Sequence, residues 1–129
     1  MLSTVAKKLR VLVIDDHETC RRVFVEYCRK LGHTSQEAAS VSEALEFLPS
    51  TDLLITDLRL PDVSGSELIC QLRHGHFSTA LQPLPAILVS ADYFALQRTP
   101  AAKLGSTVVL LKPFRLSDLS DAIKAVIGP

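Results

Sequence analysis

Hydrophobic residues along this chain alternate between short continuous runs and stretches in which they recur at every third or fourth position. Continuous apolar runs are typical of strands buried in a sheet, and the wider spacing is typical of amphipathic helices. The runs predict strands at 9–14, 33–39, 52–56, 86–89 and 107–111, of which 33–39 is the weakest because it is mostly polar. The wider spacing predicts helices at 17–31, 65–73 and 93–104, with shorter helical segments after Ser40 and Ser117.

Residues that start or interrupt helices refine these boundaries. Ser40 and Glu43 have the spacing of a capping box, and Ser117 is expected to cap the last helix. Pro100 predicts a break inside the helical pattern of 93–104. The connection 74–83 is longer than usual for such units, so we expect a partly ordered loop or an extension of the preceding helix.

Strands that alternate with helices predict a parallel sheet, because parallel neighbours are joined by a crossover that is usually a helix. We therefore expect an α/β fold, with a five-stranded parallel sheet that helices cover on both faces. The chain has 129 residues and shows no linker, internal repeat or low-complexity tract. This length fits one domain, which we expect to span residues 1–129.

Charge and composition exclude several kinds of partner. The 14 Lys and Arg residues balance 14 Asp and Glu residues, so the chain lacks the basic surface of a domain that binds nucleic acid by its phosphates. Its apolar runs are far shorter than the roughly 20 residues of a membrane helix, and its start does not resemble a signal peptide. The three cysteines form no C-x-x-C pair and cannot all be paired within the chain, so we expect reduced thiols in a cytoplasmic protein.

Polar residues that can carry chemistry follow four of the five predicted strands. Asp15 and Asp16 follow the first strand, Asp57 the third, Ser90 the fourth and Lys112 the fifth. The carboxyl ends of parallel strands line one edge of a sheet, and ligands bind in the crevice there. These five side chains are therefore expected to converge on one site.

The residue types at this edge favour phosphoryl chemistry with a metal ion. Three carboxylates in one crevice repel one another unless a cation intervenes, and oxygen-rich sites that leave room for water and phosphate suit Mg²⁺. A lysine and a hydroxyl suit the oxygens of a phosphoryl group in transfer. Asp57 has the most reason to act as the nucleophile, because it stands alone at the end of its strand with Lys112 on its other side.

These residues, in this order, resemble the receiver domains of two-component response regulators over nearly the whole chain. The resemblance is carried by the runs VLVIDD at 11–16, ITDLRLPDVSG at 55–65, ILVSA at 87–91 and LLKPF at 110–114. Each run is weak alone, but the four in this order are highly specific. The resemblance implies a flavodoxin-like, doubly wound (βα)5 fold. It also implies a phosphoacceptor signalling domain of a phosphorelay, which would catalyse at most its own phosphorylation and dephosphorylation.

The resemblance implies a role for each matched residue around the phosphoryl group. Asp57 would accept this group, Lys112 would contact its oxygens, and Ser90 would donate its hydroxyl to them. Pro113 would follow the lysine through a cis peptide bond, which is essentially a proline option. Ala91 would leave the approach to Asp57 open because its side chain is small.

The same resemblance implies a cofactor and partners. Asp16 would bind Mg²⁺ directly and Asp15 mainly through water, with Asp57 and the backbone carbonyl of Arg59 as further ligands. A histidine kinase or a histidine phosphotransfer protein would donate the phosphoryl group. A downstream effector protein or domain, and a homodimer, are further partners that the sequence leaves open.

The chain departs from the family pattern at one position. A Tyr or Phe usually lies three residues before the lysine and turns inward after phosphorylation, but this position is Val109, which has no ring to turn. We therefore expect phosphorylation to act on the rest of the protein in another way. Movement of the Ser90 loop and the helix after it is one route, and Tyr93 or Phe94 as a substitute ring is another.

Two other functions stay open. A scaffold with the receiver fold that is never phosphorylated would be expected to lose site residues, yet all five are present. A haloacid-dehalogenase-type phosphatase also uses a strand-end aspartate, Mg²⁺ and a lysine. It needs a carboxylate two residues after the nucleophile, where this chain has Arg59.

Simpler roles are open for single residues. The acidic pair Asp15 and Asp16 suits a helix N-terminus, and Ser90 suits a helix cap. His74 and His76 form a weak candidate for metal binding, since no acidic or thiol partner is evident. Arg59 is expected to lie at the site entrance, where it would modulate the lifetime of the phosphoryl group.

Overall fold

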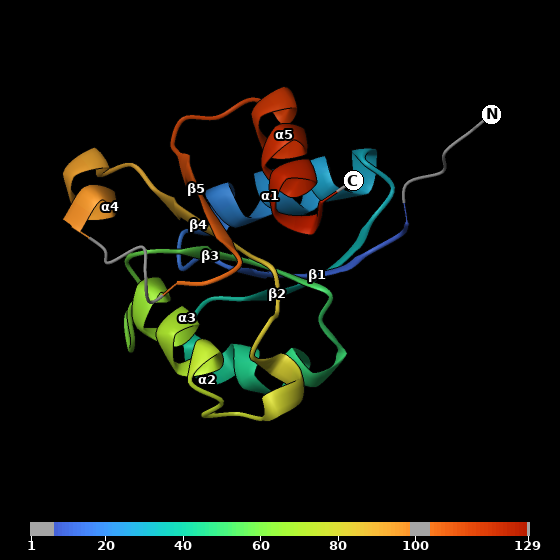
Figure 1. The fold of residues 1–129 in the computed structure, drawn as a ribbon. Helices are drawn as coiled ribbons and strands as arrows, with labels where there is room; N and C mark the ends of the chain where they lie inside the picture. The colour runs from blue at the N-terminus through green and yellow to red at the C-terminus, as the bar shows by residue number, and fades with distance from the viewer. Residues whose placement is uncertain (1–6, 99–103, 129) are drawn as a thin grey trace.

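A parallel sheet forms the centre of the computed structural model, which describes residues 7–98 and 104–128 (Figure 1). The five strands are ordered β2-β1-β3-β4-β5, and every neighbouring pair is parallel. Their bounds are β1 Arg10–Ile14, β2 Thr34–Ala38, β3 Leu53–Asp57, β4 Ala86–Ser90 and β5 Thr107–Leu111. The expected α/β fold with a five-stranded parallel sheet is confirmed.

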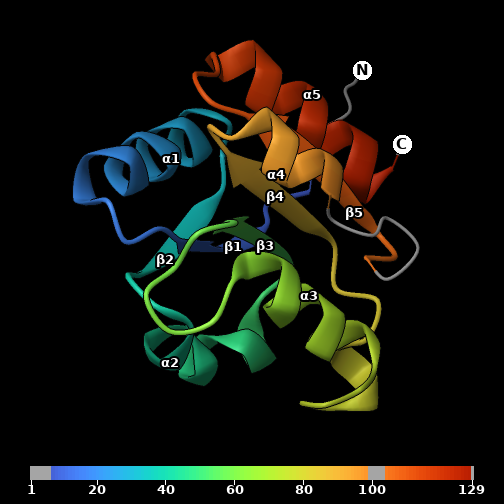
Figure 2. The same ribbon diagram turned by 90° about the vertical axis from the view of Figure 1, so that its left-hand side faces the viewer.

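Helices cover both faces of this sheet (Figures 1 and 2). One face carries α1 and α5, and the other carries α2 and α3, while α4 follows the end of β4. The bounds of the α-helices are α1 Glu18–Lys30, α2 Val41–Ala44, α3 Gly65–Arg73, α4 Tyr93–Arg98 and α5 Leu116–Ile127. Within the described residues there are also two 3-10 helices, η1 Leu45–Ser50 and η2 Thr79–Leu81. No helix in the described ranges is both long enough and apolar enough to cross a membrane.

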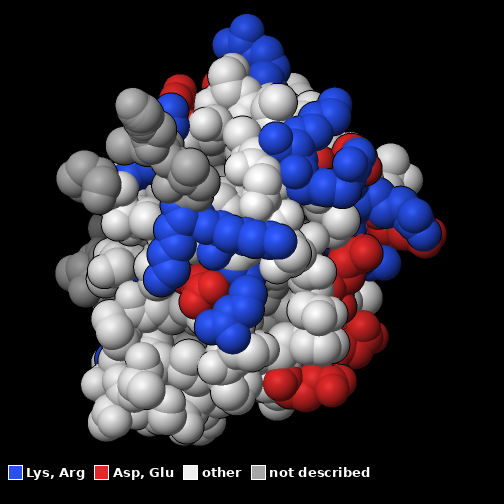
Figure 3. Space-filling model, turned by 90° about the vertical axis from the view of Figure 1, so that its right-hand side faces the viewer, with Lys and Arg blue, Asp and Glu red and all other residues white. Residues whose placement is uncertain are grey.

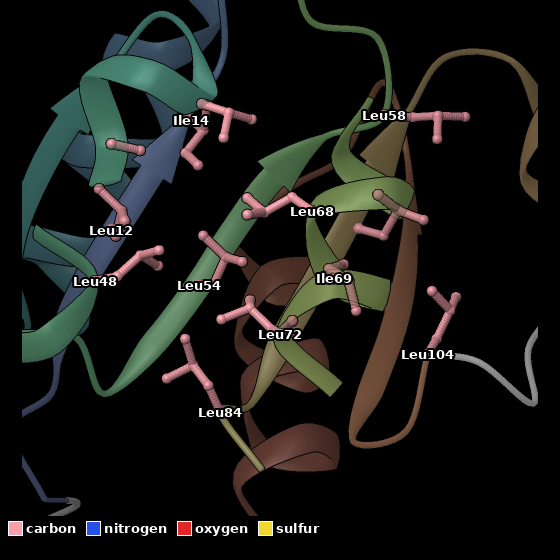
Figure 4. Close-up of a cluster of buried hydrophobic side chains, with 14 of the residues drawn as sticks. Leu12, Ile14, Leu48, Leu54, Leu58, Leu68, Ile69, Leu72, Leu84 and Leu104 are labelled. Carbon is pink, nitrogen blue, oxygen red and sulfur yellow. The ribbon is translucent and has the colours of Figure 1, made fainter. Parts of the chain in front are cut away.

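The core is divided into two clusters because successive strand residues point to opposite faces. On β3, Leu53 and Ile55 belong to the cluster under α1 and α5. Leu54, between them, belongs to the other cluster, where Figure 4 shows it beside Leu68 and Leu72 of α3. All five side chains are buried. This alternation ties the orientation of β3, and so of the residue at its end, to both layers of helices.

The two edge strands differ from each other in composition. The mostly polar stretch 33–39 does form β2, because an edge strand is partly open to water and tolerates polar side chains. The apolar run at 107–111 forms the other edge, and there Val109 is 55% exposed and Leu111 44% exposed. An apolar run therefore does not guarantee burial on both faces in β5.

Several local predictions can be compared with the structure. Ser40 caps α2 as expected, accepting a hydrogen bond from the backbone N–H of Glu43. Ser117 does not cap α5, which begins two residues earlier than a Ser117 cap allows, with Arg115 at the N-cap position. The Asp118 carboxylate accepts the backbone N–H of Arg115 at 2.8 Å. This hydrogen bond stabilises a helix that begins directly after Arg115.

The two uncertain connections have different outcomes. The stretch 74–83 is a partly ordered loop that contains η2, in which Ser78 caps the short turn through the backbone N–H of Leu81. The helical pattern predicted at 93–104 forms α4 as far as Arg98. The predicted break at Pro100 lies outside the described residues.

Arg73 connects the end of α3 to the chain on both sides of β4. Its guanidinium donates hydrogen bonds of 2.6, 2.9 and 2.9 Å to three backbone carbonyls and one of 3.0 Å to a hydroxyl. These acceptors belong to Leu104, Gln82, Ser106 and Thr107 respectively. No carboxylate of the described residues pairs with this half-buried cation, so three backbone carbonyls and one hydroxyl satisfy its charge.

We expect Arg73→Ala to lower the free energy of unfolding by about 2–4 kcal/mol, because a hydrogen bond from a charged donor contributes about 1.5–3 kcal/mol and carbonyls that lose their donor are costly. Urea unfolding followed by circular dichroism measures the loss. The matched control is Arg22→Ala, which removes an exposed arginine paired with Glu18 at 3.7 Å and is expected to cost below about 0.5 kcal/mol. Equal losses for the two variants would contradict this role for Arg73.

Candidate functional site

Three charged side chains from three strands meet at the carboxyl edge of the sheet. The Nζ atom of Lys112 lies 3.1 Å from Oδ2 of Asp15 and 3.7 Å from Oδ2 of Asp57. Asp15 follows β1, Asp57 ends β3 and Lys112 follows β5. The sheet therefore brings together residues that are far apart in the sequence, as their positions at strand ends predict.

Asp15 is fixed on all sides, although nothing in its local sequence indicates this. Its side chain is 1% exposed, and its Oδ1 accepts the backbone N–H of His17 at 2.9 Å. Its backbone carbonyl accepts a hydrogen bond from Arg21 of α1 at 2.8 Å. Both carboxylate oxygens thus have a donor, and the buried charge is held beside Lys112 in one orientation.

The surroundings of Asp57 raise the pKa of its carboxyl group. Burial raises the pKa of the Asp57 carboxyl, the charge of Lys112 lowers it, and the charge of Asp15 raises it again, with the net pKa above its ordinary value. Burial alone would lower the pKa of Lys112, but the hydrogen bond to Asp15 and the charge of Asp57 outweigh it and raise that pKa. Lys112 therefore stays protonated, while Asp57 resists ionisation in the absence of further positive charge.

The carboxylates also form an oxygen-rich group that suits a divalent cation. Oxygens of Asp15, Asp16 and Asp57 lie within 4.8 Å of one another. Within the described residues, the carboxylates of Asp15 and Asp57 share one ammonium, that of Lys112, and Asp16 forms no ion pair, so the group carries an excess of negative charge. Asp16 is exposed and is free to turn toward an ion. A small cation that prefers carboxylate and water oxygens, such as Mg²⁺, fits this donor set.

Ser90 lies at the end of β4 and is 3% exposed. Its Oγ accepts the backbone N–H of Asp92 at 2.9 Å, and Asp92 in turn caps α4 by accepting the N–H of Ala95 through Oδ1 at 2.9 Å. The helix cap is therefore Asp92, not Ser90. Because a hydroxyl both donates and accepts, Ser90 keeps its own proton for another acceptor in the site.

An open hollow of about 540 Å³ leads to Asp57. Across it, Arg59 from the β3–α3 loop forms an ion pair with Asp92 from the β4–α4 loop, with 2.5 Å between Nη2 and Oδ2. Arg59 thus lies at the site entrance as predicted, but its pairing with Asp92 is not visible in the sequence. The hollow is lined by Asp57, Arg59, Ser90, Ala91, Asp92, Tyr93, Phe94 and Lys112.

The site needs a residue without a side chain at position 65, which is Gly65. A Cβ atom at this position would lie 2.2 Å from the backbone oxygen of Asp57 and 3.0 Å from Oγ1 of Thr56. The N–H of Gly65 also donates to the carbonyl of Leu58 at 2.8 Å. The start of α3 therefore lies directly against the backbone of Asp57. A side chain at position 65 would force that backbone to move, and the Asp57 carboxylate would move with it.

The remaining sequence-based candidates are placed as follows. The peptide bond between Lys112 and Pro113 is cis, as predicted. Val109 is exposed at the edge of the sheet. Among the described residues, Asp15, Asp16 and Asp57 form the one group of at least three acidic, His or Cys residues that could hold a metal ion. His74 and His76 are not part of such a group, and His74 instead bonds the carbonyl of Cys70.

Comparison with known proteins gives a consistent result. The family model of the response regulator receiver domain matches residues 11–124. The chain is 31% identical to the chemotaxis protein CheY of Pseudomonas aeruginosa over 121 residues, which cover 92% of this chain and 95% of that protein. It is 34% identical to the sensor protein EvgS of Escherichia coli O157:H7 over 118 residues, which cover 90% of this chain and 9% of that protein.

Solved structures show the same fold. The receiver domain of a sensor histidine kinase from Pseudomonas aeruginosa, with a magnesium ion coordinated in its active site cleft, matches with a TM-score of 0.81 and 22% identity. That match covers 95% of this chain and all of the other. The chemotaxis response regulator CheY4 of Vibrio cholerae matches with a TM-score of 0.78 and 21% identity, covering 93% of this chain and 99% of that one.

The raised pKa of Asp57 has a consequence for stability. An acid whose pKa is higher in the folded protein has no effect on stability below the unfolded value of 3.8; above it the fold loses stability progressively, and the loss is complete above the raised pKa. In metal-free buffer at pH 7 we therefore expect Asp57→Asn to melt a few degrees higher than the parent chain. The gain should shrink as the pH falls through the raised pKa, which differential scanning calorimetry at several pH values measures.

Asp121→Asn, which removes an exposed carboxylate of α5, is the matched control and should leave the melting temperature nearly unchanged. If Asp57→Asn does not raise the melting temperature at pH 7, or raises it by the same amount near pH 4, then the ionisation of Asp57 does not destabilise the fold.

Proposed function

The chain belongs to the response regulator receiver domain family, and we propose that Asp57 is the residue on which it accepts a phosphoryl group. Receiver domains are phosphoacceptor signalling domains of two-component systems, and they interact with histidine kinases and effectors. In this proposal residues 1–129 form a single receiver domain that catalyses at most its own phosphorylation and dephosphorylation. The observation that carries the choice of Asp57 is its place beside Lys112, Asp15 and Asp16 at the end of β3.

The reaction places a carboxylate oxygen of Asp57 on the phosphorus of a phosphohistidine. A P–O bond forms as the P–N bond breaks, and the imidazole leaves with the electron pair of that bond. Lys112 is close enough to hold an oxygen of the transferred group while still paired with Asp15. Ser90 donates a hydrogen bond from its hydroxyl to a second oxygen while its Oγ accepts the N–H of Asp92.

The residues that would hold Mg²⁺ are Asp16 directly and Asp15 mainly through water, with Asp57 and the backbone carbonyl of Arg59. When bound, the ion supplies positive charge that offsets the carboxylates and the phosphoryl oxygens. Two observations support this set. Asp16 is exposed with room to turn, whereas both oxygens of Asp15 are already engaged by Lys112 and His17.

The phosphoryl donor in this proposal is a histidine kinase or a histidine phosphotransfer protein. Donor and acceptor would meet in the cytoplasm, and the free thiols of Cys20, Cys28 and Cys70 agree with a reducing compartment. The domain would then act on a downstream effector protein or domain, without binding nucleic acid or membrane itself.

Phosphorylation would be passed on through the β4–α4 connection instead of a ring at position 109. The chain of contacts runs from Ser90 to Asp92 and on to Arg59 and the first turn of α4. A phosphoryl group that draws in Ser90 would strain the Ser90–Asp92 bond and shift the start of α4. The exposed rings of Tyr93 and Phe94 lie on that turn and would move with it.

Incubation with acetyl phosphate and Mg²⁺ tests the acceptor. We expect the intact chain to gain the mass of one phosphoryl group, the peptide containing Asp57 to carry it, and EDTA to prevent it. Asp57→Asn and Lys112→Ala should both stay unmodified, while Asp121→Asn, the exposed control, should react like the parent. A chain that never forms the adduct would support the scaffold alternative, and continuous release of phosphate from added phosphoesters would support a phosphatase.

The Arg59–Asp92 ion pair is expected to lengthen the life of the acyl phosphate by limiting the approach of water. Arg59→Ala should therefore lose its phosphoryl group several-fold faster than the parent chain, measured as the decay of the phosphorylated mass after the donor is removed. Asp92→Asn keeps a capping oxygen for α4 but removes the ion pair, so it should show the same change. Unchanged decay in both variants would rule out this role.

A further inference from the structure

A second hollow, of about 500 Å³, lies at the amino-terminal edge of the sheet, at the opposite end of the strands from Asp57. Leu9 and His33, which directly precede β1 and β2, form one side of it. The carboxyl-terminal half of α5 forms the other side through Ile123 and Ile127. Its size lies within the range of about 300–1,000 Å³ that is usual for sites of small ligands.

The hollow is mostly apolar but contains one buried polar side chain. His33 is 9% exposed, and its Nδ1 accepts the backbone N–H of Leu9 at 3.0 Å. A ring nitrogen that accepts carries no proton, so the imidazole is neutral and its proton is on Nε2. Burial also lowers the pKa of His33, which keeps the ring in this neutral form.

The Nε2–H group of His33 is available to a ligand. Nε2 of His33 forms no hydrogen bond within the described residues. Every buried side-chain nitrogen there has a hydrogen-bond partner, so Nε2 is not a buried atom. Nε2 must therefore be accessible to solvent, and His33 lines the hollow. A single directed donor in an apolar surrounding is the usual way in which a small-ligand site fixes the polar end of its ligand.

Positive charge borders the same hollow. Lys7 and Lys124 both line it, both are exposed, and neither forms an ion pair within the described ranges. Figure 3 shows Lys and Arg side chains across the upper part and the centre of this face, with acidic side chains mostly along its right and lower right and one among the basic side chains at the centre. Asp52 lies in the field of Lys7, but Arg10 already binds its carboxylate. The border of the hollow is thus cationic while the whole chain is neutral.

We propose that this hollow binds a small amphipathic carboxylate, such as a medium-chain fatty acid. The hydrocarbon chain would lie on Leu9, Ile123 and Ile127, and the carboxylate would accept the Nε2–H of His33 in the field of Lys7 and Lys124. Charge complementarity favours an anion, and the apolar lining favours one with a hydrocarbon body over a free inorganic ion. The site uses none of the residues around Asp57, so its occupation can be tested independently of phosphorylation.

Octanoate is the probe, titrated into the isotope-labelled full chain and followed by NMR. We expect saturable shifts of the His33 imidazole and of the Ile123 and Ile127 methyl groups, with little change at Asp57. Octanol, which has the same chain without the charge, and acetate, which has the charge without the chain, should each bind about tenfold more weakly or not at all. Octanol binding as tightly as octanoate, or shifts that do not saturate, would overturn the proposal.

Substitutions test whether His33 supplies the hydrogen-bond donor and whether Lys7 and Lys124 supply the positive charge for the ligand. His33→Asn keeps an oxygen that can accept the Leu9 N–H but removes the Nε2 donor, and Lys7→Ala combined with Lys124→Ala removes the cationic border. Each should weaken octanoate binding by about threefold to tenfold. Lys8→Ala, an exposed neighbour that does not line the hollow, is the matched control and should bind like the parent.

Ile127→Asn, near the exposed end of α5, tests the apolar contact without changing the inner core, and it too should weaken binding. Octanoate affinity that is unchanged in Ile127→Asn and in the lysine double variant would place the ligand elsewhere and overturn the proposal, even if His33→Asn fails to fold.

Discussion

The site depends above all on one interaction, the contact of Lys112 with Asp15 and Asp57. Two carboxylates lie within 3.1 and 3.7 Å of a single ammonium, and a third, that of Asp16, is close by. Full compensation would need two more positive charges. Burial is the main cause of the raised pKa of Asp57, and the negative charge of Asp15 adds to it. A site with this deficit suits a divalent cation and a ligand that the cation and Lys112 can share. The same deficit is tolerated only because the sheet fixes the three side chains in place.

That fixation comes from the hydrogen-bond ladder, which continues past the formal strand ends. The backbone N–H groups of Asp15, Leu58 and Lys112 donate to carbonyls on the neighbouring strands at 3.1, 2.7 and 2.9 Å. Asp15, Lys112 and the residue after Asp57 are therefore held by backbone hydrogen bonds before any side chain contributes. Strand orientation is secured in turn by the two apolar clusters, since a slip of one residue would turn Leu54 to the wrong face.

The sequence was sufficient for those features that depend on local pattern and on parallel-sheet geometry. Apolar runs identify four of the five strands, and residues at strand ends must converge, so Asp15, Asp57, Ser90 and Lys112 could be placed together from the sequence alone. Features that depend on distances between separate loops could not be read in this way. Examples are the ion pair of Arg59 with Asp92, the close approach of Gly65 to the backbone of Asp57, and the hydrogen bonds from Arg73 to three backbone carbonyls. Ser117 failed as a cap because Asp118 offered a competing acceptor.

The helices also differ in how firmly they are held, and this bears on how a change at Asp57 can spread. In the described part of the chain, α3 buries Gly65, Leu68, Ile69 and Leu72, whereas α4 buries Leu96 alone. Moving α3 would open the core, but moving the start of α4 would mainly shift exposed rings. If Asp57 is phosphorylated as proposed, Val109 has no ring to turn inward, and a displacement of the start of α4 would disturb the core least. The Ser90–Asp92 hydrogen bond already connects that helix to the site.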